Sequence, residues 1–323
     1  MGDSDNIWAL VLAAGDGRRL QGLTTTRSGL AIPKQFCSLE RGPSLLREAI
    51  ARATAITAPA RICAIVAAQH RRWWRGQLAD LEADNVIVQP QNRGTAIGLL
   101  LPLLTILRRD PAARIVVLPS DHHVRDEARL AHALRYAATP PASDRPQIVL
   151  LGLQPALADP QLGYIVPRRA ASQTHHAVDR FVEKPDPIRA QRLLDQGALW
   201  NTFIMAADAQ ALLELFEHRF PAIVASMRDA IGRGSLAELY ETLPDLDFSR
   251  AILQGQERHL RVLPVPDCGW SDLGTPERVA AALDGLPRST RNVARAPAGS
   301  DVLLSLATQA AAMGRYQVAA AGG

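Results

Sequence analysis

Residues 7–20 read IWALVLAAGDGRRL, an apolar run of strand length that ends at a turn containing two glycines. A continuous apolar run of this kind is typical of a strand buried on both faces of a parallel sheet. Similar runs recur along the first half of the chain, at residues 61–67, 85–89, 114–118 and 147–152. Stretches with helical spacing lie between them, at residues 44–57, 71–84, 95–109 and 126–138. The alternation predicts an α/β fold built on a doubly wound, mostly parallel, Rossmann-like sheet.

The pattern changes after residue 162. Short extended pieces are expected at residues 163–167 and 178–182, around a polar stretch at 170–176, and one more strand at 261–266. Helices are expected at residues 186–196, 208–218, 221–231 and 275–283. We therefore predict one domain over residues 1–284 that contains an inserted subregion. Residues 285–323 are rich in Ala, Arg and Gly, and we expect a tail that is partly disordered or loosely docked.

Composition excludes several classes of protein. The chain has 323 residues, of which 47% are hydrophobic and 21% charged, so it is not a mainly disordered, collagen-like or fibrous chain. No apolar run is long enough to span a bilayer, and the short acidic start does not resemble a secretory signal. Three cysteines imply no disulfide framework, so a cytoplasmic location is expected. The net charge of +4 suits an anionic small molecule and gives no support for nucleic-acid or membrane partners.

The glycine turn is a candidate phosphate site. Gly15 and Gly17 allow backbone N–H groups to approach a phosphate, and Arg19 is available to hold further phosphates. The turn matches neither a dinucleotide fingerprint, which needs glycine where Leu20 stands, nor a Walker loop. A plain connection between a strand and a helix is therefore the alternative.

Two lysines stand out because the chain uses arginine almost everywhere. Of 36 lysines and arginines together, only Lys34 and Lys184 are lysine. A compact ammonium reaches one oxygen where the planar guanidinium fork does not fit. Lys34 follows Pro33 in a loop and can point back over the glycine turn, whereas Lys184 adjoins Glu183 at the end of a strand. A site for sugar hydroxyls and a phosphate, or a surface ion pair, would both explain that second lysine.

Two acids are candidates for binding a metal ion. Asp121 follows the strand at 114–118, and ligands bind at the carboxyl edge of open α/β sheets. Mg²⁺ prefers one or two carboxylates together with substrate phosphates. Asp272 lies in a glycine-bracketed turn and is either a second such acid or a residue that starts a helix. We interpret His122 and His123 as structural rather than as zinc ligands, because neighbouring side chains point in different directions.

Residues 71–75 read RRWWR, basic residues interleaved with aromatic ones. Such clusters bind single-stranded nucleic acid in some proteins. Here they open an amphipathic helical stretch, so we expect core-facing tryptophans with a solvated arginine face, and a contact between subunits as the second choice.

Seven motifs in this order resemble the sugar-phosphate nucleotidyltransferases, and within them most closely the mannose-1-phosphate guanylyltransferases. They are AAGDGRRL (13–20), PKQF (33–36), LPSDHH (118–123), LGYI (162–165), FVEKP (181–185), WNTFI (200–204) and GWSDLGT (269–275). The resemblance runs from about residue 7 to residue 283. It implies the fold of nucleotide-diphospho-sugar transferases, in which the inserted subregion binds the sugar.

The resemblance also implies roles for individual residues. Catalysis is expected from Arg19, Lys34, Asp121 and Lys184. The nucleotide is expected to contact Ala14, Gly15, Gly17, Arg19, Lys34, Gln89, Gly94 and Thr95. The sugar phosphate is expected to contact Gly163, Glu183, Lys184 and Asn201. Mg²⁺ is the expected cofactor, on Asp121 and Asp272.

The implied reaction is the Mg²⁺-dependent transfer of a nucleotidyl group from an NTP to a sugar 1-phosphate, with GTP and mannose 1-phosphate as the leading pair. The chain departs from the family where the base is read, because Gln89 and Gly94 stand where many members have Glu and Asn. The same reaction with another pair, of the dTDP- or UDP-glucose type, is therefore an alternative. A catalytically silent sensor of nucleotide sugars is another. The expected partners are small-molecule substrates, with a homodimer left open.

Overall fold

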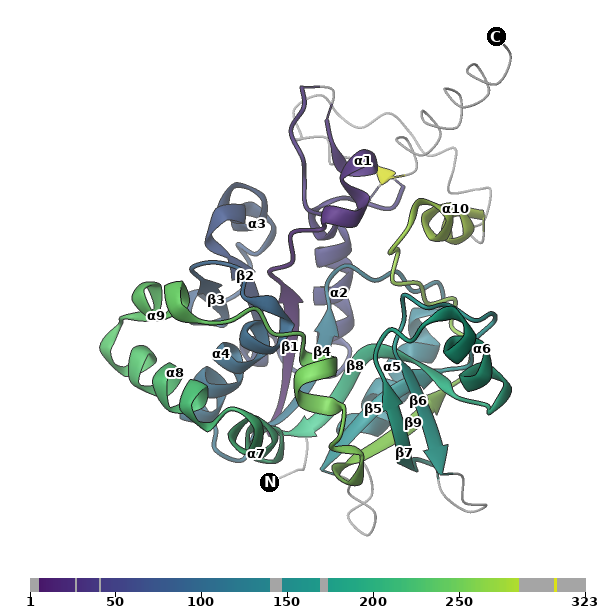
Figure 1. Ribbon diagram of the computed structural model, residues 1–323. Coiled ribbons are helices and arrows are strands. Elements are labelled where there is room, and N and C mark those ends of the chain that lie inside the picture. The colour runs from purple at the N-terminus through teal and green to yellow at the C-terminus, as the bar shows by residue number, and fades with distance from the viewer. Residues whose placement is uncertain are drawn as a thin grey trace.

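A single mixed sheet runs through the molecule, and helices cover both of its faces (Figure 1). The structure is a computed structural model that describes residues 6–26, 28–40, 42–139, 147–168, 174–284 and 305–306. The strands of the sheet are β1 (Ile7–Ala13), β2 (Ile62–Ala67), β3 (Val86–Gln89), β4 (Arg114–Pro119), β5 (Ile148–Leu153), β6 (Tyr164–Arg168), β7 (His176–Val182), β8 (Leu199–Asp208) and β9 (Leu260–Val265). Their order across the sheet is β3-β2-β1-β4-β8-β5-β9-β7-β6.

The strands of the first half are parallel, and those of the second half are mixed. β1 pairs in parallel with β2 and β4, and β2 with β3, as the sequence predicts. β8 is antiparallel to both β4 and β5, whereas β9 is parallel to β5. The prediction of an α/β fold is thus confirmed, but a mostly parallel sheet describes only the first four strands. β8 is largely buried, so its sequence lacks the alternation that marks most antiparallel strands.

The helices are α1 (Gln21–Thr24), α2 (Leu45–Thr54), α3 (Arg71–Gln77), α4 (Gly94–Arg109), α5 (Glu127–Ala138), α6 (Pro187–Asp195), α7 (Ala209–Arg219), α8 (Pro221–Arg233), α9 (Leu236–Thr242) and α10 (Pro276–Asp284). The expected helix at residues 71–84 already ends at Gln77, just after Gly76, a residue that disfavours helix. α9 was not predicted. No helix in the described ranges is long and apolar enough to cross a membrane.

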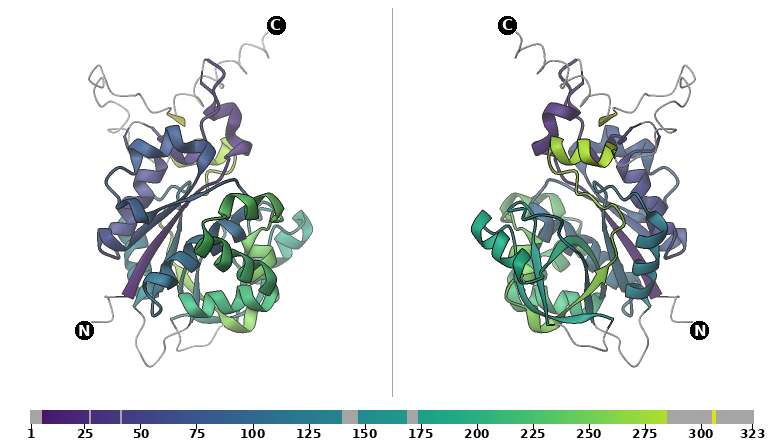
Figure 2. Two further views of the ribbon diagram at one scale, coloured as in Figure 1. Left: turned by 90° about the vertical axis from the view of Figure 1, so that its left-hand side faces the viewer. Right: turned by 90° about the vertical axis from the view of Figure 1, so that its right-hand side faces the viewer.

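β1 separates two hydrophobic cores, because its successive side chains point to opposite faces. Trp8 and Leu10 pack in a core with residues of α4, α7 and α8. Ile7, Ala9 and Val11 pack on the other face, in a core with residues of α2 and α5. The side views show these two helical layers (Figure 2). Each fully buried aliphatic side chain of this kind contributes roughly 1.5–3 kcal/mol, so β1 is held firmly and its carboxyl end is a rigid base for the glycine turn.

The inserted subregion lies between β5 and β8. The hairpin of β6 and β7 extends the sheet, and α6 packs beside it in a small core of its own (Figure 1). α6 begins where the sequence places a cap: the Asp186 side chain accepts a hydrogen bond from the N–H of Arg189, and Pro187 is the first helical residue. The start of β6 pairs with the start of β8 on one side and with the end of β7 on the other.

The basic cluster of residues 71–75 lies on α3. Trp74 is buried and its indole N–H donates to the Ala67 carbonyl at 2.9 Å, with the arginines exposed, as predicted.

Of residues 285–323, only two are described. The N–H of Leu306 donates to the Ser38 carbonyl at 3.0 Å, and its side chain is buried. The rest of the predicted tail, and residues 170–173 of the polar stretch, lie outside the described residues.

Candidate active site

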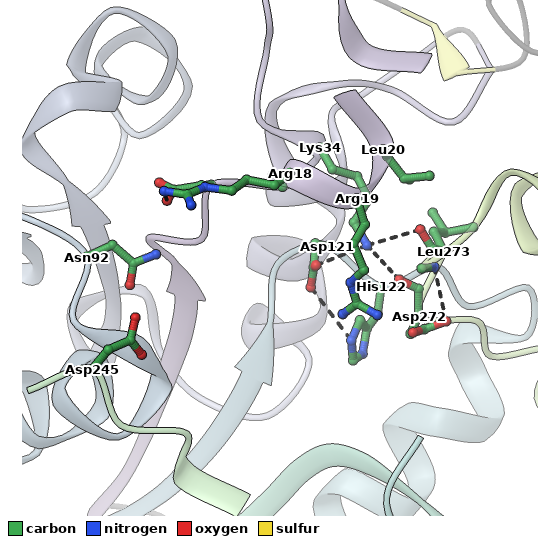
Figure 3. A pocket seen from close by; sticks show the side chains of 13 residues that line it. Arg18, Arg19, Leu20, Lys34, Asn92, Asp121, His122, Asp245, Asp272 and Leu273 are labelled. Carbon is green, nitrogen blue, oxygen red and sulfur yellow. Dashed lines mark hydrogen bonds and ion pairs between the residues drawn. The ribbon is translucent and has the colours of Figure 1, made fainter. Parts of the chain in front are cut away.

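Lys34 links the two candidate metal-binding acids (Figure 3). Its side chain is only 7% exposed, and its Nζ lies 3.0 Å from Oδ2 of Asp121. The same ammonium donates to the carbonyls of Asp272 at 2.6 Å and Leu273 at 3.3 Å. Three converging oxygens match the three N–H donors of an ammonium. The lysine therefore fixes the loop after β4 against the turn before α10, segments more than a hundred residues apart in sequence.

The glycine turn packs directly against this lysine. Gly17 has a φ of +64°, and a Cβ there would lie 2.9 Å from the backbone nitrogen of Lys34, so this position requires glycine. Gln35 is buried, and its amide nitrogen donates to the carbonyls of Ala13 at 3.1 Å and Gly15 at 2.7 Å. In the PKQF motif, Lys34 thus faces the acids and the next residue, Gln35, supports the turn.

His122 and His123 hold the two acid-bearing loops together. The indole N–H of Trp270 donates to Nδ1 of His122 at 3.2 Å, which requires that nitrogen to carry no proton. Burial, opposed by Asp121, lowers the pKa of His122 to about 4, so the ring is neutral at pH 7. The backbone of His123 pairs with that of Ser271 in both directions at 2.9 Å. His122 thus contributes through its ring and His123 through its backbone.

Asp121 is ionised in this setting. Partial burial raises its pKa, but the charge of Lys34 outweighs that effect, and the pKa lies below its usual value. Its side chain is 41% exposed at the mouth of a hollow of about 420 Å³. Arg18 points away from it, and its Nη2 lies 3.2 Å from Oδ2 of Asp16, whereas Arg19 lines the same hollow as Lys34 and the two acids (Figure 3). Asp121 therefore presents a negative charge to a space bordered by cations.

Asp272 is held differently from Asp121. Nη1 of Arg278 lies 2.6 and 2.7 Å from its two carboxylate oxygens, and the N–H of Gly274 donates to Oδ1 at 3.1 Å. The other terminal nitrogen of Arg278 pairs with Asp159. Neither Arg278 nor Asp159 was predicted as a site residue from the sequence.

The carboxylate oxygens of Asp121 and Asp272 are the type of ligand that a hard divalent cation prefers. Within the described residues no group of three or more His, Cys, Asp or Glu side chains could hold a metal ion. Magnesium needs less, because one or two carboxylates with substrate phosphates suffice. Asp121 satisfies that requirement as it stands, whereas Asp272 satisfies it only if Arg278 moves away.

The expected nucleotide residues other than Lys34, which lines the first hollow, line a second one of about 430 Å³. The two hollows share residues that include Gly17, Arg19 and Asp121. Gln89 lines this hollow and is only 1% exposed. Neither its amide oxygen nor its amide nitrogen has a hydrogen-bond partner in the described part of the chain. Such an orphaned buried amide is rare and points to a missing partner. A Cβ on Gly94, whose φ is +78°, would collide with the Leu246 carbonyl.

The expected sugar-phosphate residues also meet. A Cβ on Gly163 would lie 2.6 Å from Oε2 of Glu183 and 3.3 Å from Cβ of Asn201. Lys184 lies 3.0 Å from Oε1 of Glu183 and 3.6 Å from Oδ2 of Asp247. Burial raises the pKa of Glu183 above its usual value, and the charge of Lys184 opposes that shift. Glu183 and Lys184 line the second hollow, while Gly163 and Asn201 lie behind them.

The structure brings every predicted site residue to these two adjoining hollows or directly behind them. The residues that sequence reasoning missed there are Gln35, Asp159, Asp245, Asp247 and Arg278. Gln35 adjoins a residue that was predicted, and the two missed aspartates at 245 and 247 form an acidic pair in a short loop. The contact between Arg278 and Asp159 joins distant segments and leaves no local signal.

The fold and this site define the class of protein. The family model described as nucleotidyl transferase matches residues 8–288, so the chain belongs to the nucleotidyl transferase family. Members of this family generally use a divalent metal ion.

Individual relatives indicate a narrower group. The chain is 29% identical over 282 residues to xanthan biosynthesis protein XanB of Xanthomonas campestris pv. campestris, covering 84% of this chain and 58% of the relative. It is 29% identical over 291 residues to mannose-1-phosphate guanylyltransferase RfbM of Salmonella typhimurium, covering 82% and 56%. The chain thus spans somewhat more than half the length of these relatives.

A solved structure is similar as well. The crystal structure titled mannose-1-phosphate geranyltransferase, from Thermus thermophilus, matches with a TM-score of 0.73 and 27% identity, over 87% of this chain and 80% of that one. A UDP-glucose pyrophosphorylase structure, at 14% identity and a TM-score of 0.57, shares the fold alone.

Proposed function

We propose that this protein transfers a nucleotidyl group from an NTP to a sugar 1-phosphate and releases pyrophosphate, with GTP and mannose 1-phosphate as its substrates and Mg²⁺ as its cofactor. The observation that carries the proposal is the pair of adjoining hollows, one bordered by the glycine turn and Lys34, the other by Glu183 and Lys184. One space can thus take a triphosphate and a sugar phosphate together. The relatives named as mannose-1-phosphate guanylyltransferases support the choice of substrates.

The reaction needs no general base. A sugar 1-phosphate is largely dianionic at neutral pH, so its oxygen attacks the α-phosphorus of the NTP directly, in line with the departing pyrophosphate. The obstacles are repulsion between anions and the charge that develops on the leaving oxygen. Lys34, Lys184 and Arg19 supply positive charge around both phosphates. The turn at Gly17 packs against the backbone of Lys34, and Lys184 is held by Glu183 and Asp247. Bound Mg²⁺ would neutralise further phosphate charge, with Asp121 and Asp272 as the residues that would hold it.

Gln89 supports a thymine or uracil nucleotide nearly as well as a guanine nucleotide. Its unpartnered amide offers one donor and one acceptor. That pair matches the N1–H and O6 edge of guanine, but it equally matches the N3–H and O4 edge of thymine or uracil. Synthesis of a dTDP- or UDP-sugar is therefore the second candidate.

The test is pyrophosphate release by the purified chain with Mg²⁺, across four NTPs and a panel of sugar 1-phosphates. Release confined to GTP with mannose 1-phosphate supports the proposal. Release with another pair supports the reaction but assigns it other substrates. Bound nucleotide without release in any combination overturns the proposal in favour of a silent sensor.

A Gln89→Glu variant sharpens the choice of base. A carboxylate accepts two hydrogen bonds from N1–H and N2–H₂ of guanine, but it repels O4 of thymine or uracil. The variant should therefore raise the preference for GTP over dTTP and UTP by at least about tenfold, the factor that roughly 1.4 kcal/mol gives. Gln91→Glu adds the same charge in the same loop outside both hollows, and should leave the preference unchanged.

A further inference from the structure

Arg278 joins two carboxylates of different loops, and the reaction proposed above uses neither Arg278 nor Asp159. The guanidinium lies on the first turn of α10, with one nitrogen on both oxygens of Asp272 and the other on Asp159. The side chains are mostly buried, with 18% of Arg278, 13% of Asp272 and 14% of Asp159 exposed. Charged groups this far from water are held by their partners rather than by solvent.

The chain makes room for this arrangement. A Cβ on Gly274 would lie 2.6 Å from Oδ2 of Asp272 and 2.8 Å from Nη1 of Arg278, so glycine leaves the space that the ion pair fills. Burial lowers the pKa of Arg278, but Asp272 and Asp159 outweigh it and raise the pKa above its ordinary value. The guanidinium is therefore a permanent charge in this place.

Asp159 connects the arginine to the sugar side of the site. Its backbone N–H donates to the Tyr164 hydroxyl at 2.7 Å, and that hydroxyl donates to the Asp159 carbonyl at 3.2 Å. Tyr164 begins β6, directly after Gly163. A change in the position of the Arg278 side chain, which pairs with Asp159, therefore also affects the segment that leads into Gly163.

We propose that Arg278 is an internal counter-ion for Asp272, and that a divalent cation reaches Asp272 only by displacing it. The proposal rests on the proposed function, which gives Asp272 a metal ion. Until the exchange occurs, Asp121 is the acid that remains open. After it, the guanidinium keeps Asp159 as its partner, so occupation of Asp272 and the position of the Gly163 segment change together. Arg278 is in this sense a positioning residue.

The experiment measures binding of Mn²⁺ alone to the full chain, by electron paramagnetic resonance, in the absence of substrates. Arg278→Met keeps the apolar stem and removes the competing charge, and it should tighten Mn²⁺ binding by about tenfold, equivalent to roughly 1.4 kcal/mol. The same substitution in an Asp272→Asn background should give no such gain, because the freed carboxylate is then absent.

Arg125→Met is the matched control. Arg125 packs against Gly269 and pairs weakly with Asp267 at 3.9 Å, so its loss removes the same charge near the same turn without a contact to Asp272. It should change Mn²⁺ affinity less than twofold, about 0.4 kcal/mol. Circular dichroism and urea unfolding establish that each variant is folded.

An equal Mn²⁺ affinity in wild type and Arg278→Met overturns the proposal, and so does a gain that persists with Asp272→Asn. Pyrophosphate release by the wild type tests the proposed function separately. A wild type that turns over while Arg278→Met binds Mn²⁺ no tighter refutes the counter-ion alone. A wild type that is silent with every substrate pair refutes the function, whatever the affinities are.

Discussion

Replacement of Lys34 by methionine is the sharpest test of how this site is built. Methionine keeps most of the buried apolar volume and removes the charge together with all three N–H donors. The variant leaves Oδ2 of Asp121 without its ammonium and the carbonyls of Asp272 and Leu273 without their donors. We expect both stability and turnover to fall, for separate reasons that separate measurements resolve.

The loss of stability follows from these contacts. Each carbonyl that loses its donor costs about 1 kcal/mol. The pair with Asp121 adds little, at most about 1 kcal/mol, because that carboxylate is 41% exposed and screened by water. Release of the buried ammonium from its desolvation penalty offsets part of the loss. We expect the free energy of unfolding to fall by about 2 kcal/mol, and turnover to fall by about 10²–10³-fold, as on loss of one preorganised donor.

Urea unfolding followed by tryptophan fluorescence gives the first quantity, and pyrophosphate release gives the second. Lys34→Arg is the companion variant: it retains the charge, but the planar fork does not match three converging acceptors in a buried space, and overpacking costs about 1–3 kcal/mol. A methionine variant as stable as the wild type and within tenfold of its rate would refute the reasoning. So would an arginine variant with full activity.

Three further substitutions test other residues. Gly163 and Trp270 belong to the site, whereas Glu48 is a mostly buried acid of α2 whose Oε2 lies 3.5 Å from Arg52. Gly163→Ala places a Cβ 2.6 Å from Oε2 of Glu183, so KM for the sugar phosphate should rise about tenfold in steady-state assays while KM for the NTP is unchanged. Burial, opposed by Arg52, raises the pKa of Glu48 to about 7, so stability falls as pH rises from about 4.5 to 7. Glu48→Gln should gain up to about 3 kcal/mol over wild type at pH 8 and nothing at pH 4, in urea unfolding. Trp270→Phe removes the donor on Nδ1 of His122, so the histidine pKa, about 4, should rise in an NMR titration; an unchanged value contradicts that role.

The fold was predictable where burial leaves a local signature. The apolar runs of β1 to β5 and the glycine turn lie within a few residues of the predicted ranges. β1, β2, β4 and β5 are buried on both faces, and such strands need continuous apolar sequence. β8 was not among the predicted strands, and its direction was not predictable in the same way either. A buried antiparallel strand has the same composition as a parallel one, and only its partners across the sheet, β4 and β5, determine its orientation.

Site residues in local motifs were predictable, whereas contacts between distant segments were not. Lys34 and Asp121 were found because each lies in a motif beside a strand or turn. That their side chains meet at 3.0 Å is a consequence of the parallel strands β1 and β4 ending at one edge. The partners of Asp272 were missed, because Arg278 reads locally as a solvated charge in the first turn of a helix. Its second contact, Asp159, lies 119 residues away.

The Gln35 amide has a consequence for the peptide groups of the glycine turn. A trans peptide directs its C=O and the following N–H to opposite sides. Because Gln35 binds the carbonyls of Ala13 and Gly15, the N–H groups of Ala14 and Asp16 are turned away from it. An uncharged side chain thereby sets the polarity of the turn, so loss of this amide would free both peptides to flip and present oxygen instead of N–H to an anion.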